Sequence, residues 1–343
     1  MQMKTIVALR LERQGFCPHV SEESFRELFR RMSPVAPPYW CCPGSPPELR
    51  CRTDFDSAAS CFAARARREI VKGRFQAGNI AYILAEELPL FAALYQSGGG
   101  LSERERALRA VLEREGPMSV RMLKEFTGEP VKELTADLHR LQKRFLVFED
   151  QADSEWDRCW YRMEEVFPEL DRAKPPFEAA LEEVLLRFVQ LNVTAGVEAA
   201  VSFYHLPVRK VEAAFQRLLI EGKLTLCREE FILPRDVPLL EKEMEPPRCV
   251  FALNRNDFLV KANEYWLREV YRYPGREVLQ YLLIDGEFGG VTVGKFRNGP
   301  FEIEDILLNL PPEEWKGRRE EILKAVGLEN PASVPRRYCG KPL

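Results

Sequence analysis

The chain has 343 residues, which is enough for about two to four domains, and its 45% hydrophobic and 30% charged content is typical of a soluble globular protein. No stretch approaches the roughly 18 to 20 uninterrupted apolar residues of a membrane span, and residues 1–10 hold too short an apolar run for a signal peptide. A membrane-spanning or secreted class is therefore excluded, and we expect a cytoplasmic protein. The formal net charge of -3 at pH 7 does not by itself indicate a nucleic-acid binder, because phosphate binding depends on local clusters of Lys and Arg.

The positive charge is unevenly distributed along the chain. Residues 1–80 hold 13 Lys and Arg against 8 Asp and Glu, a local balance of +5, whereas the remaining residues carry -8. A basic surface is therefore expected mainly in the first domain.

The first hundred residues predict helices and a strand around a proline-rich segment. Ser21 is placed as the N-cap of a helix that runs to Met32. Segment 34–47 is rich in proline and predicts an ordered loop or a lid. A second helix is expected from Asp56 to Gly73. A strand over 79–84, a short helix over 86–95 and a flexible joint at 97–100 follow.

The helix expected over 56–73 has the densest positive charge in the chain. Its basic side chains, together with one just beyond it, are the strongest candidates for contacts with DNA phosphates: Arg65, Arg67, Arg68, Lys72 and Arg74. A solvated basic face without a ligand is the alternative.

An internal repeat spans roughly 101–165 and 177–235. Each copy predicts a first helix (102–115 and 177–191), a short second helix (120–126 and 197–204) and a third helix that begins at a proline (130–144 and 207–221). The apolar positions of the third helices correspond at a spacing of 77 residues: Val131, Leu134, Leu138 and Leu141 match Val208, Val211, Phe215 and Leu218. This spacing predicts one buried stripe on each third helix.

Short extended segments follow each third helix, 145–149 with 159–163 and 224–227 with 231–233, and each pair predicts a small β-hairpin. Three helices and a hairpin are the plan of a winged helix-turn-helix domain, in which the third helix can enter the major groove. The candidate DNA contacts on the outward faces are Lys132, Arg140, Lys143, Arg209, Lys210 and Arg217. Acidic neighbours such as Glu133, Asp137 and Glu212 make the charge mixed, so solvated faces used for scaffolding or protein contacts are the alternative.

Beyond Pro246 and Pro247 the chain is predicted to be β-rich. Strands over 279–284 and 291–296 flank Asp285-Gly286, a strong hairpin signal, and 301–307 is a further candidate strand. A charged helix is expected over 315–326, ended by Gly327. The aromatic residues of this part are expected to pack in a core, with stacking on a flipped or unpaired base as the alternative: Tyr265, Trp266, Tyr271, Tyr273 and Tyr281.

The nine cysteines include no C-x-x-C pair, and the chain has only three histidines, so no metal site and no cofactor are predicted. Five cysteines lie early in the chain and are interpreted as buried or incidental thiols: Cys17, Cys41, Cys42, Cys51 and Cys61.

Two motifs, together with the order of these elements, resemble the winged-helix crosslink-repair and alkylpurine DNA glycosylases. The run VKGRFQAGNIAYILAEELP over 71–89 is similar to the family's basic-strand-acidic stretch, with Gly78, Glu86 and Leu88 at its recurrent positions. The runs YWLREVY over 265–271 and YLLIDGEFGGV over 281–291 are similar to its Trp-Glu-Val-Tyr and aromatic-hairpin segment. The resemblance covers most of the chain and implies tandem winged helices that bind double-stranded DNA.

The sequence departs from this family at the catalytic positions. The family's glycosylases use a Gln-x-Gln or Gln-x-Asp element after the first helix to activate water, but the corresponding place here reads MSPVAPPY over 32–39. Ala77 and Ala81 stand where the family usually has Arg and His. Asp54 and Asp56 lie nearby, but a surface-loop role and an N-cap role are the better interpretation, so no catalytic residue is assigned.

The sequence therefore predicts a mainly α chain with small β-hairpins (α+β), built of tandem winged helix-turn-helix domains and a C-terminal β-rich domain. The expected domains are a diverged winged-helix-like domain with a Pro/Cys-rich loop (1–97), two winged-helix domains (101–170 and 175–240) and a β-rich domain with a terminal helix (246–343). We expect a glycosylase-like protein that binds double-stranded DNA in repair or damage recognition. Two alternatives remain open: an active DNA glycosylase with a rearranged site, in which Tyr39 and Trp40 contact DNA, and a winged-helix transcriptional regulator or scaffold.

Overall fold

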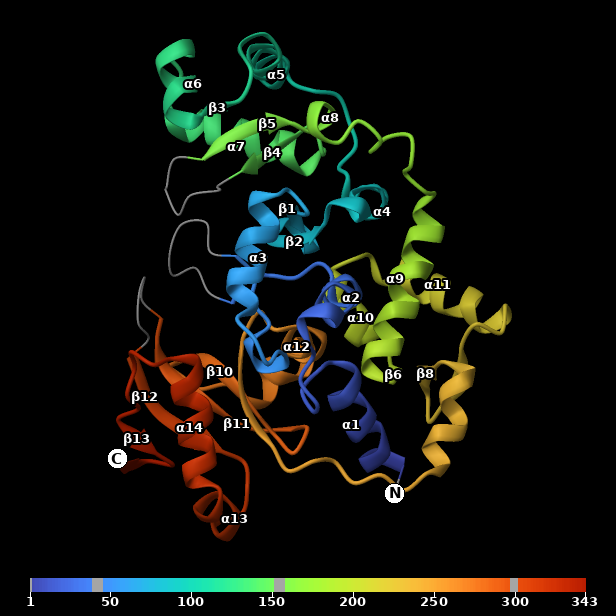
Figure 1. Cartoon of the computed structure of the whole chain (residues 1–343), viewed down its shortest axis with the longest axis vertical. Coiled ribbons are helices and arrows are strands. Elements are labelled where there is room, and N and C mark those ends of the chain that lie inside the picture. Colours follow the sequence, from blue (N-terminus) through green and yellow to red (C-terminus); the bar gives the residue numbers. More distant parts are fainter. Residues whose placement is uncertain (1, 39–45, 151–157, 297–301) are drawn as a thin grey trace.

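The computed structural model describes residues 2–38, 46–150, 158–296 and 302–343. Figure 1 shows an elongated molecule in which most of the first hundred residues lie centrally, and the first repeated unit lies at one end. The second repeated unit and the C-terminal sheet lie toward the other end. None of the described helices is long and apolar enough to cross a membrane. The aromatic residues Tyr39 and Trp40, and the thiols Cys41 and Cys42, lie outside the described residues.

The first part of the chain combines α-helices with a two-stranded antiparallel sheet. The helix predicted to end at Met32 and the strand predicted over 79–84 are both confirmed. The elements in order are α1 (Gln2–Arg13), α2 (Glu22–Met32), η1 (Arg50–Arg52), α3 (Ser57–Ala66), β1 (Ile70–Phe75), η2 (Gln76–Gly78), β2 (Asn79–Leu84), η3 (Ala85–Glu87) and α4 (Leu88–Tyr95).

The helix predicted over 56–73 ends at Ala66, so its expected C-terminal boundary at Gly73 is wrong. Arg68 adopts a left-handed φ of 59°, which a continuing helix does not allow. The chain then enters β1, which pairs with β2 from Ile70↔Leu84 to Phe75↔Asn79. Lys72 and Arg74 therefore stand on one face of a strand rather than on a helix.

Both copies of the repeat fold alike, with three helices and a three-stranded antiparallel sheet. The first copy consists of α5 (Glu103–Glu115), β3 (Met118–Ser119), α6 (Val120–Thr127), α7 (Val131–Lys143), β4 (Val147–Asp150) and β5 (Cys159–Arg162). The second consists of α9 (Phe177–Asn192), β6 (Thr194–Ala195), α10 (Val197–Tyr204), α11 (Val208–Ile220), β7 (Thr225–Cys227) and β8 (Glu230–Ile232). The strand orders β3-β5-β4 and β6-β8-β7 correspond. α8 (Met163–Val166) follows the first sheet, and η4 (Pro234–Glu241) follows the second.

The apolar stripes predicted on the third helices are buried except at their first positions. The buried members are Leu134, Leu138 and Leu141 of α7, and Val211, Phe215 and Leu218 of α11. Val131 and Val208, in contrast, are 46% and 49% exposed. Each of these valines is the first residue of its helix.

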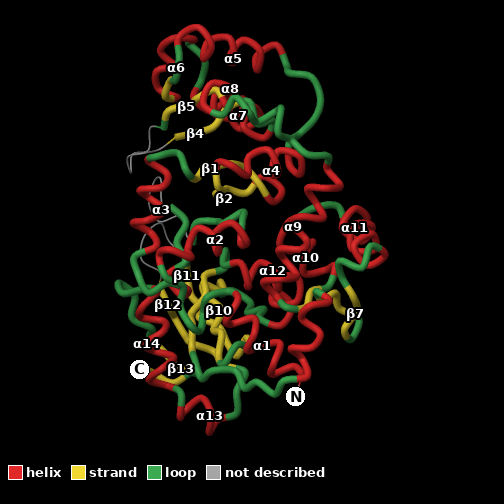
Figure 2. Tube along the Cα trace, turned by 45° about the vertical axis from the view of Figure 1, so that its right-hand side comes forward, coloured by secondary structure: helices red, strands yellow, loops and turns green. Residues whose placement is uncertain are grey.

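The two repeated units differ in how they join the rest of the molecule. The first has a core of its own around Leu123, Leu138 and Trp160. The second shares a large core with the first part of the chain, in which Phe188 and Phe203 lie with Tyr82 and Phe91. The first unit also contributes Phe145, Phe148 and Met163 to the large core, in addition to its own core. The second unit is packed against the centre of the molecule (Figure 2).

The C-terminal part is a six-stranded sheet with helices around it, in the order β14-β13-β12-β11-β10-β9. The predicted hairpin at Asp285-Gly286 is confirmed, with φ values of 51° and 86° that suit this two-residue turn. The elements are β9 (Val250–Asn254), α12 (Phe258–Val270), β10 (Glu277–Ile284), β11 (Glu287–Lys295), β12 (Glu302–Leu308), α13 (Pro312–Gly317), α14 (Arg319–Glu329), β13 (Arg337–Tyr338) and β14 (Lys341–Pro342).

Two features of this part differ from the sequence predictions. The helix expected over 315–326 is divided at Arg318 into α13 and α14, and Gly327 lies inside α14 instead of ending it. The long helix α12 was not predicted, because its aromatic and β-branched residues are also typical of strands.

Candidate nucleic-acid interface and pocket

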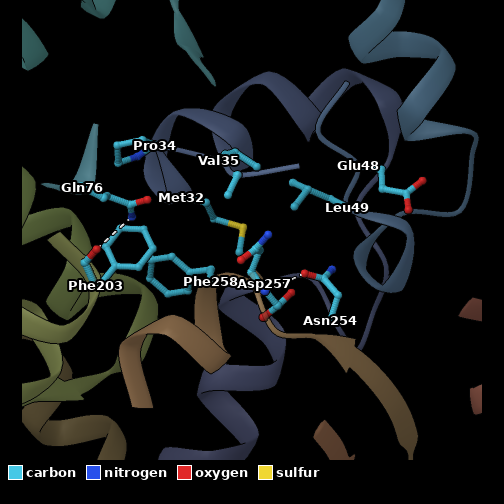
Figure 3. Close-up of a pocket in the computed structure, with 12 residues that line it drawn as sticks. Met32, Pro34, Val35, Glu48, Leu49, Gln76, Phe203, Asn254, Asp257 and Phe258 are labelled. Atoms are coloured by element: carbon cyan, nitrogen blue, oxygen red, sulfur yellow. Dashed lines mark hydrogen bonds between the residues drawn. The ribbon is translucent and has the colours of Figure 1, made fainter. Parts of the chain in front are cut away.

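A small pocket lies where the first part, the second repeated unit and the C-terminal part meet (Figure 3). Its lining comes from the segment after α2, the β1–β2 turn, α10 and the β9–α12 connection: Met32, Pro34, Val35, Ala36, Glu48, Leu49, Gln76, Phe203, Asn254, Asn256, Asp257 and Phe258. Residues 32–36 belong to the stretch in which the resemblance expects a water-activating element. The cavity measures about 20 Å³, which leaves room for about one water molecule. A nucleobase does not fit unless the lining moves.

The polar side chains of this pocket are engaged in structural contacts. Asp257 accepts two hydrogen bonds from the buried guanidinium of Arg52, with Nη2–Oδ1 at 2.8 Å, and it also caps α12. Gln76 Nε2 donates to the carbonyl of Phe203 at 2.8 Å. Asn256 Nδ2 donates to a carbonyl of the proline-rich segment at 3.0 Å. These hydrogen bonds join the three parts of the chain. The side-chain atoms that form them are not free at the same time to hold and activate a water molecule.

Glu48 is the pocket carboxylate with the loosest contacts. Its ion pair within the described residues is with the half-exposed Arg50, at 3.2 Å. Figure 3 places Glu48 at the end of the pocket away from Phe203. No motif marked Glu48 in the sequence. Asp56 caps α3 by accepting a hydrogen bond from Ala59 N at 3.0 Å, which confirms its predicted N-cap role, and the exposed Asp54 does not line the pocket.

Two of the five basic residues predicted to contact phosphates in the first domain are buried. Arg65 is 4% exposed, and its guanidinium carbon lies 5.1 Å from the centre of the Phe62 ring. Lys72 pairs with Glu149 of β4 at 3.2 Å, and both side chains are almost completely excluded from solvent. A DNA phosphate does not reach Arg65 or Lys72 in this conformation.

The other three basic residues of the first domain lie at or near the surface. Arg67 is exposed and pairs with Glu69 at 2.7 Å. Arg68 pairs with Asp150 at 3.2 Å and lies 4.5 Å from the centre of the Tyr161 ring. The contacts of Arg68 therefore cross the boundary between the first part of the chain and the first repeated unit.

The hydrogen bonds of Arg74 also cross this boundary, and its hydrogen-bond partners are neutral groups. Its guanidinium donates to Gln142 Oε1 at 3.0 Å and to the carbonyl of Gly78 at 3.3 Å. Burial, and after it the positive charge of Arg74, lowers the pKa of His139 to about 4. The imidazole is therefore neutral at pH 7, and its Nε2 accepts a hydrogen bond from Arg74 Nη2 at 2.8 Å. Nothing in the sequence indicated this contact, since the two residues belong to different units.

The third helices of the repeat carry both unpaired and paired cations. Lys132, Lys143 and Arg209 are exposed, and within the described residues they form no ion pair. Arg140, Lys210 and Arg217 pair with Glu105, Glu178 and Glu182 at 3.0, 3.5 and 2.7 Å. The unpaired three are the cations of these helices that are open to a phosphate.

Most of the C-terminal aromatic residues pack in a core, as expected. Tyr271 and Tyr281 are buried, and Trp266 and Tyr273 pack against the same cluster. Tyr265, in contrast, is half-exposed on α12.

The early cysteines that the structure describes are protonated thiols. Burial raises the pKa of Cys61 to about 12, and it also raises the pKa values of Cys17 and Cys51.

No model of a known protein family matches this sequence, and no curated protein matches it. Among solved structures, the fold matches the Streptomyces sahachiroi DNA glycosylase AlkZ with a TM-score of 0.68. The match covers 97% of this chain and 99% of that chain, at 14% sequence identity. The chain has a DNA-glycosylase-like fold. This glycosylase-like fold includes both repeated units and the C-terminal sheet, because almost the whole chain takes part in the match.

Proposed function

We propose that this protein binds double-stranded DNA through tandem winged-helix units and acts in DNA repair or damage recognition. The proposed units span 101–170 and 175–240, with a diverged unit at 1–97 and a β-rich domain at 246–343. The observation that carries the proposal is the match of nearly the whole chain to the fold of a DNA glycosylase. The order of three helices and a small sheet in both repeats supports the winged-helix assignment.

The proposed contacts with the DNA backbone are exposed or partly exposed cations of two regions. Lys132, Lys143 and Arg209 lie on the third helices, and their charge is not neutralised by a described carboxylate. Arg67, Arg68 and Arg74 lie at or near the boundary between the first domain and the first repeated unit. Arg140, Lys210 and Arg217 contribute if a phosphate replaces their present carboxylate partners.

The proposed activity is DNA binding without base release. A glycosylase needs room for an unstacked base and a group that holds the attacking water. The small volume of the pocket and the structural contacts of Asp257, Gln76 and Asn256 argue against both in this conformation.

The test is fluorescence-anisotropy binding to plain and alkylated duplexes over a salt series, with base release assayed in the same samples. The variant replaces Lys132, Lys143 and Arg209 with Ala. Its matched control replaces three exposed, paired cations elsewhere with Ala: Lys4, Arg172 and Arg248. We expect salt-sensitive binding by the wild type, a loss of affinity on every sequence in the variant, and little change in the control.

Three other results would redirect the assignment. Free base released from the alkylated duplex would indicate an active glycosylase with a rearranged site. Equal losses in the variant and the control would remove the third helices from the interface. Absence of binding at low salt would favour a scaffold with protein partners.

A further inference from the structure

The C-terminal edge of the large sheet carries a cluster of cations. β13 and β14 form a short antiparallel ribbon there, with Arg337↔Pro342 and Tyr338↔Lys341 as paired residues. The exposed cations of the ribbon and of the adjoining helices α13 and α14 are Lys316, Arg319, Arg336, Arg337 and Lys341. Over the described part of the chain, none of these five has a carboxylate within 4.0 Å. Most of the basic residues discussed above, in contrast, have one.

Three of these cations surround an aromatic pair. The rings of Trp315 and Tyr338 lie 5.6 Å apart, and Tyr338 Oη donates to the carbonyl of Trp315 at 2.8 Å. The Nζ atoms of Lys316 and Lys341 lie 5.7 and 5.9 Å from the centre of the Trp315 ring. The Arg319 guanidinium carbon lies 5.8 Å from the centre of the Tyr338 ring. Ring faces attract cations without neutralising them, so the cluster keeps its positive charge.

The nearby acidic residues offset this charge only in part. The buried carboxylate of Asp305 accepts a hydrogen bond from Gly340 N, between β13 and β14, at 3.2 Å. Glu313 and Glu314 line a different groove, between α13 and α1. Glu321 is already paired with Arg248 and Arg318, at 2.5 and 2.8 Å. Glu320 lies in the first turn of α14, so Glu320 and Asp305 together set two negative charges against the five positive ones.

α14 links this cluster to the region of the pocket. At its C-terminal end, Arg50 Nη1 donates to the carbonyl of Leu328, and Cys51 Sγ donates to Glu329 Oε1, each at 3.1 Å. The helix has 11 residues, so a length of about 16 Å separates the cluster from these contacts. Figures 1 and 2 both show α14 and β13 on the same side of the molecule as α3.

We propose that this C-terminal cluster is a second contact for the DNA backbone, separate from the third helices. The proposal rests on the proposed DNA binding and extends it. Duplex DNA advances about 3.4 Å per base pair, so a duplex that passes the pocket reaches the cluster after about five further base pairs. Cations that lack carboxylate partners bind phosphates without first breaking an ion pair, which makes this edge of the sheet suited to a nucleic-acid strand.

The test compares two variants with equal changes in charge on duplexes of two lengths. The first variant replaces Lys316, Arg319 and Lys341 with Gln. The matched control replaces three exposed or half-exposed cations of the same part of the chain that have carboxylate partners with Gln: Arg248, Arg268 and Arg276. Both variants are expected to have the same melting temperature as the wild type, because the replaced side chains lie at the surface.

The cluster variant is expected to lose roughly tenfold in affinity for a duplex of about 30 base pairs, with a salt slope lower by about 2 to 3. For a duplex of about 10 base pairs, the affinity of the cluster variant is expected to stay within about twofold of the wild-type affinity. The control variant is expected to stay within about twofold of the wild-type affinity on both duplexes.

Equal losses on the short and long duplexes, an unchanged salt slope or the same loss in the control would overturn this second contact and leave the proposed function in place. No binding of the wild type to either duplex would overturn both. Loss of binding to phosphatidylserine vesicles with unchanged binding to the long duplex would assign the cluster to a lipid surface instead.

Discussion

Lys72 and Glu149 form a buried ion pair that joins the first part of the chain to the first repeated unit. Lys72 Nζ of β1 lies 3.2 Å from Glu149 Oε1 of β4, and the side chains are 7% and 0% exposed. Arg158 reaches the other carboxylate oxygen at 2.6 Å. Burial opposes the charge of Glu149, but Lys72 and Arg158 outweigh it and hold the pKa of this carboxyl below its usual value.

Replacement of Glu149 with Gln is therefore expected to destabilise the protein by about 3 kcal/mol or more, because two cations are left without a compensating charge in a buried place. Urea unfolding gives the free energy. Lys4→Ala, which removes an exposed ion pair with Glu245, is the control and is expected to leave the free energy of unfolding unchanged. Similar losses of unfolding free energy in both variants would contradict the expectation that the buried ion pair contributes more than the exposed one.

His139 is expected to make the protein less stable in acid. Its pKa is about 4 in the folded protein, against an unfolded value of about 6.5. Between these values the unfolded chain binds more protons, so stability decreases as the pH falls from about 6.5 to about 4. Because the ring is only half-buried, we expect a loss of about 1 to 2 kcal/mol.

The variant His139→Gln tests this expectation, since its amide oxygen can accept the hydrogen bond of Arg74 but does not titrate. Urea unfolding at pH 7, 5.5 and 4.5 is expected to show a steeper decrease for the wild type than for the variant. A constant difference between the two proteins over this range would argue against a neutral, buried imidazole.

The two aspartates near the proline-rich segment are expected to differ in their effect on stability. Asp56→Ala removes the N-cap of α3 and is expected to cost about 1 kcal/mol. Asp54→Ala changes an exposed side chain, and its free energy of unfolding is expected to match that of the wild type. Neither variant is expected to change DNA affinity. If the wild type released an alkylated base and either variant did not, a catalytic role would replace the structural one.

Gly286 at the β10–β11 turn is expected to tolerate no side chain. Its φ is 86°, and a Cβ atom there would lie 2.3 Å from Val7 Cγ1 of α1. Gly286→Ala is therefore expected to cost about 2 to 4 kcal/mol from backbone strain and overpacking together. Gly275→Ala, at φ 75° with open space around it, is the control for strain alone and is expected to cost about 1 kcal/mol. Both losses are measured by urea unfolding. Equal losses in the free energy of unfolding would mean that a side chain at position 286 does not clash with α1.

Local patterns predicted the repeat and the C-terminal hairpin because their signals lie within a few residues of one another. The stripe at Leu134, Leu138 and Leu141 indicates a helix with one buried face, and it is found in α7. The Asp285-Gly286 turn indicates its hairpin in the same way.

α1 was missed because its environment, rather than its own pattern, makes it a buried helix. The successive residues from Thr5 to Leu9 are all buried, since α1 packs against the C-terminal strands on one side and the second repeated unit on another. A helix covered on several sides has no single apolar stripe, so its periodicity does not reveal it.

The sequence by itself determined the order of the repeated elements, the hairpin turns and which residues carry charge. The tertiary structure alone decided which of those charged side chains are exposed and free to bind a ligand. Lys72 and Arg74 stand two residues apart on one strand, yet Lys72 is buried against Glu149 while Arg74 has neutral partners in another unit. No sequence motif distinguishes Lys341 from the other lysines. In the folded protein it lies beside Trp315, and within the described residues it has no carboxylate partner. The reason is that electrostatic interactions depend on distance in space and on burial, and both arise between segments that are far apart along the chain.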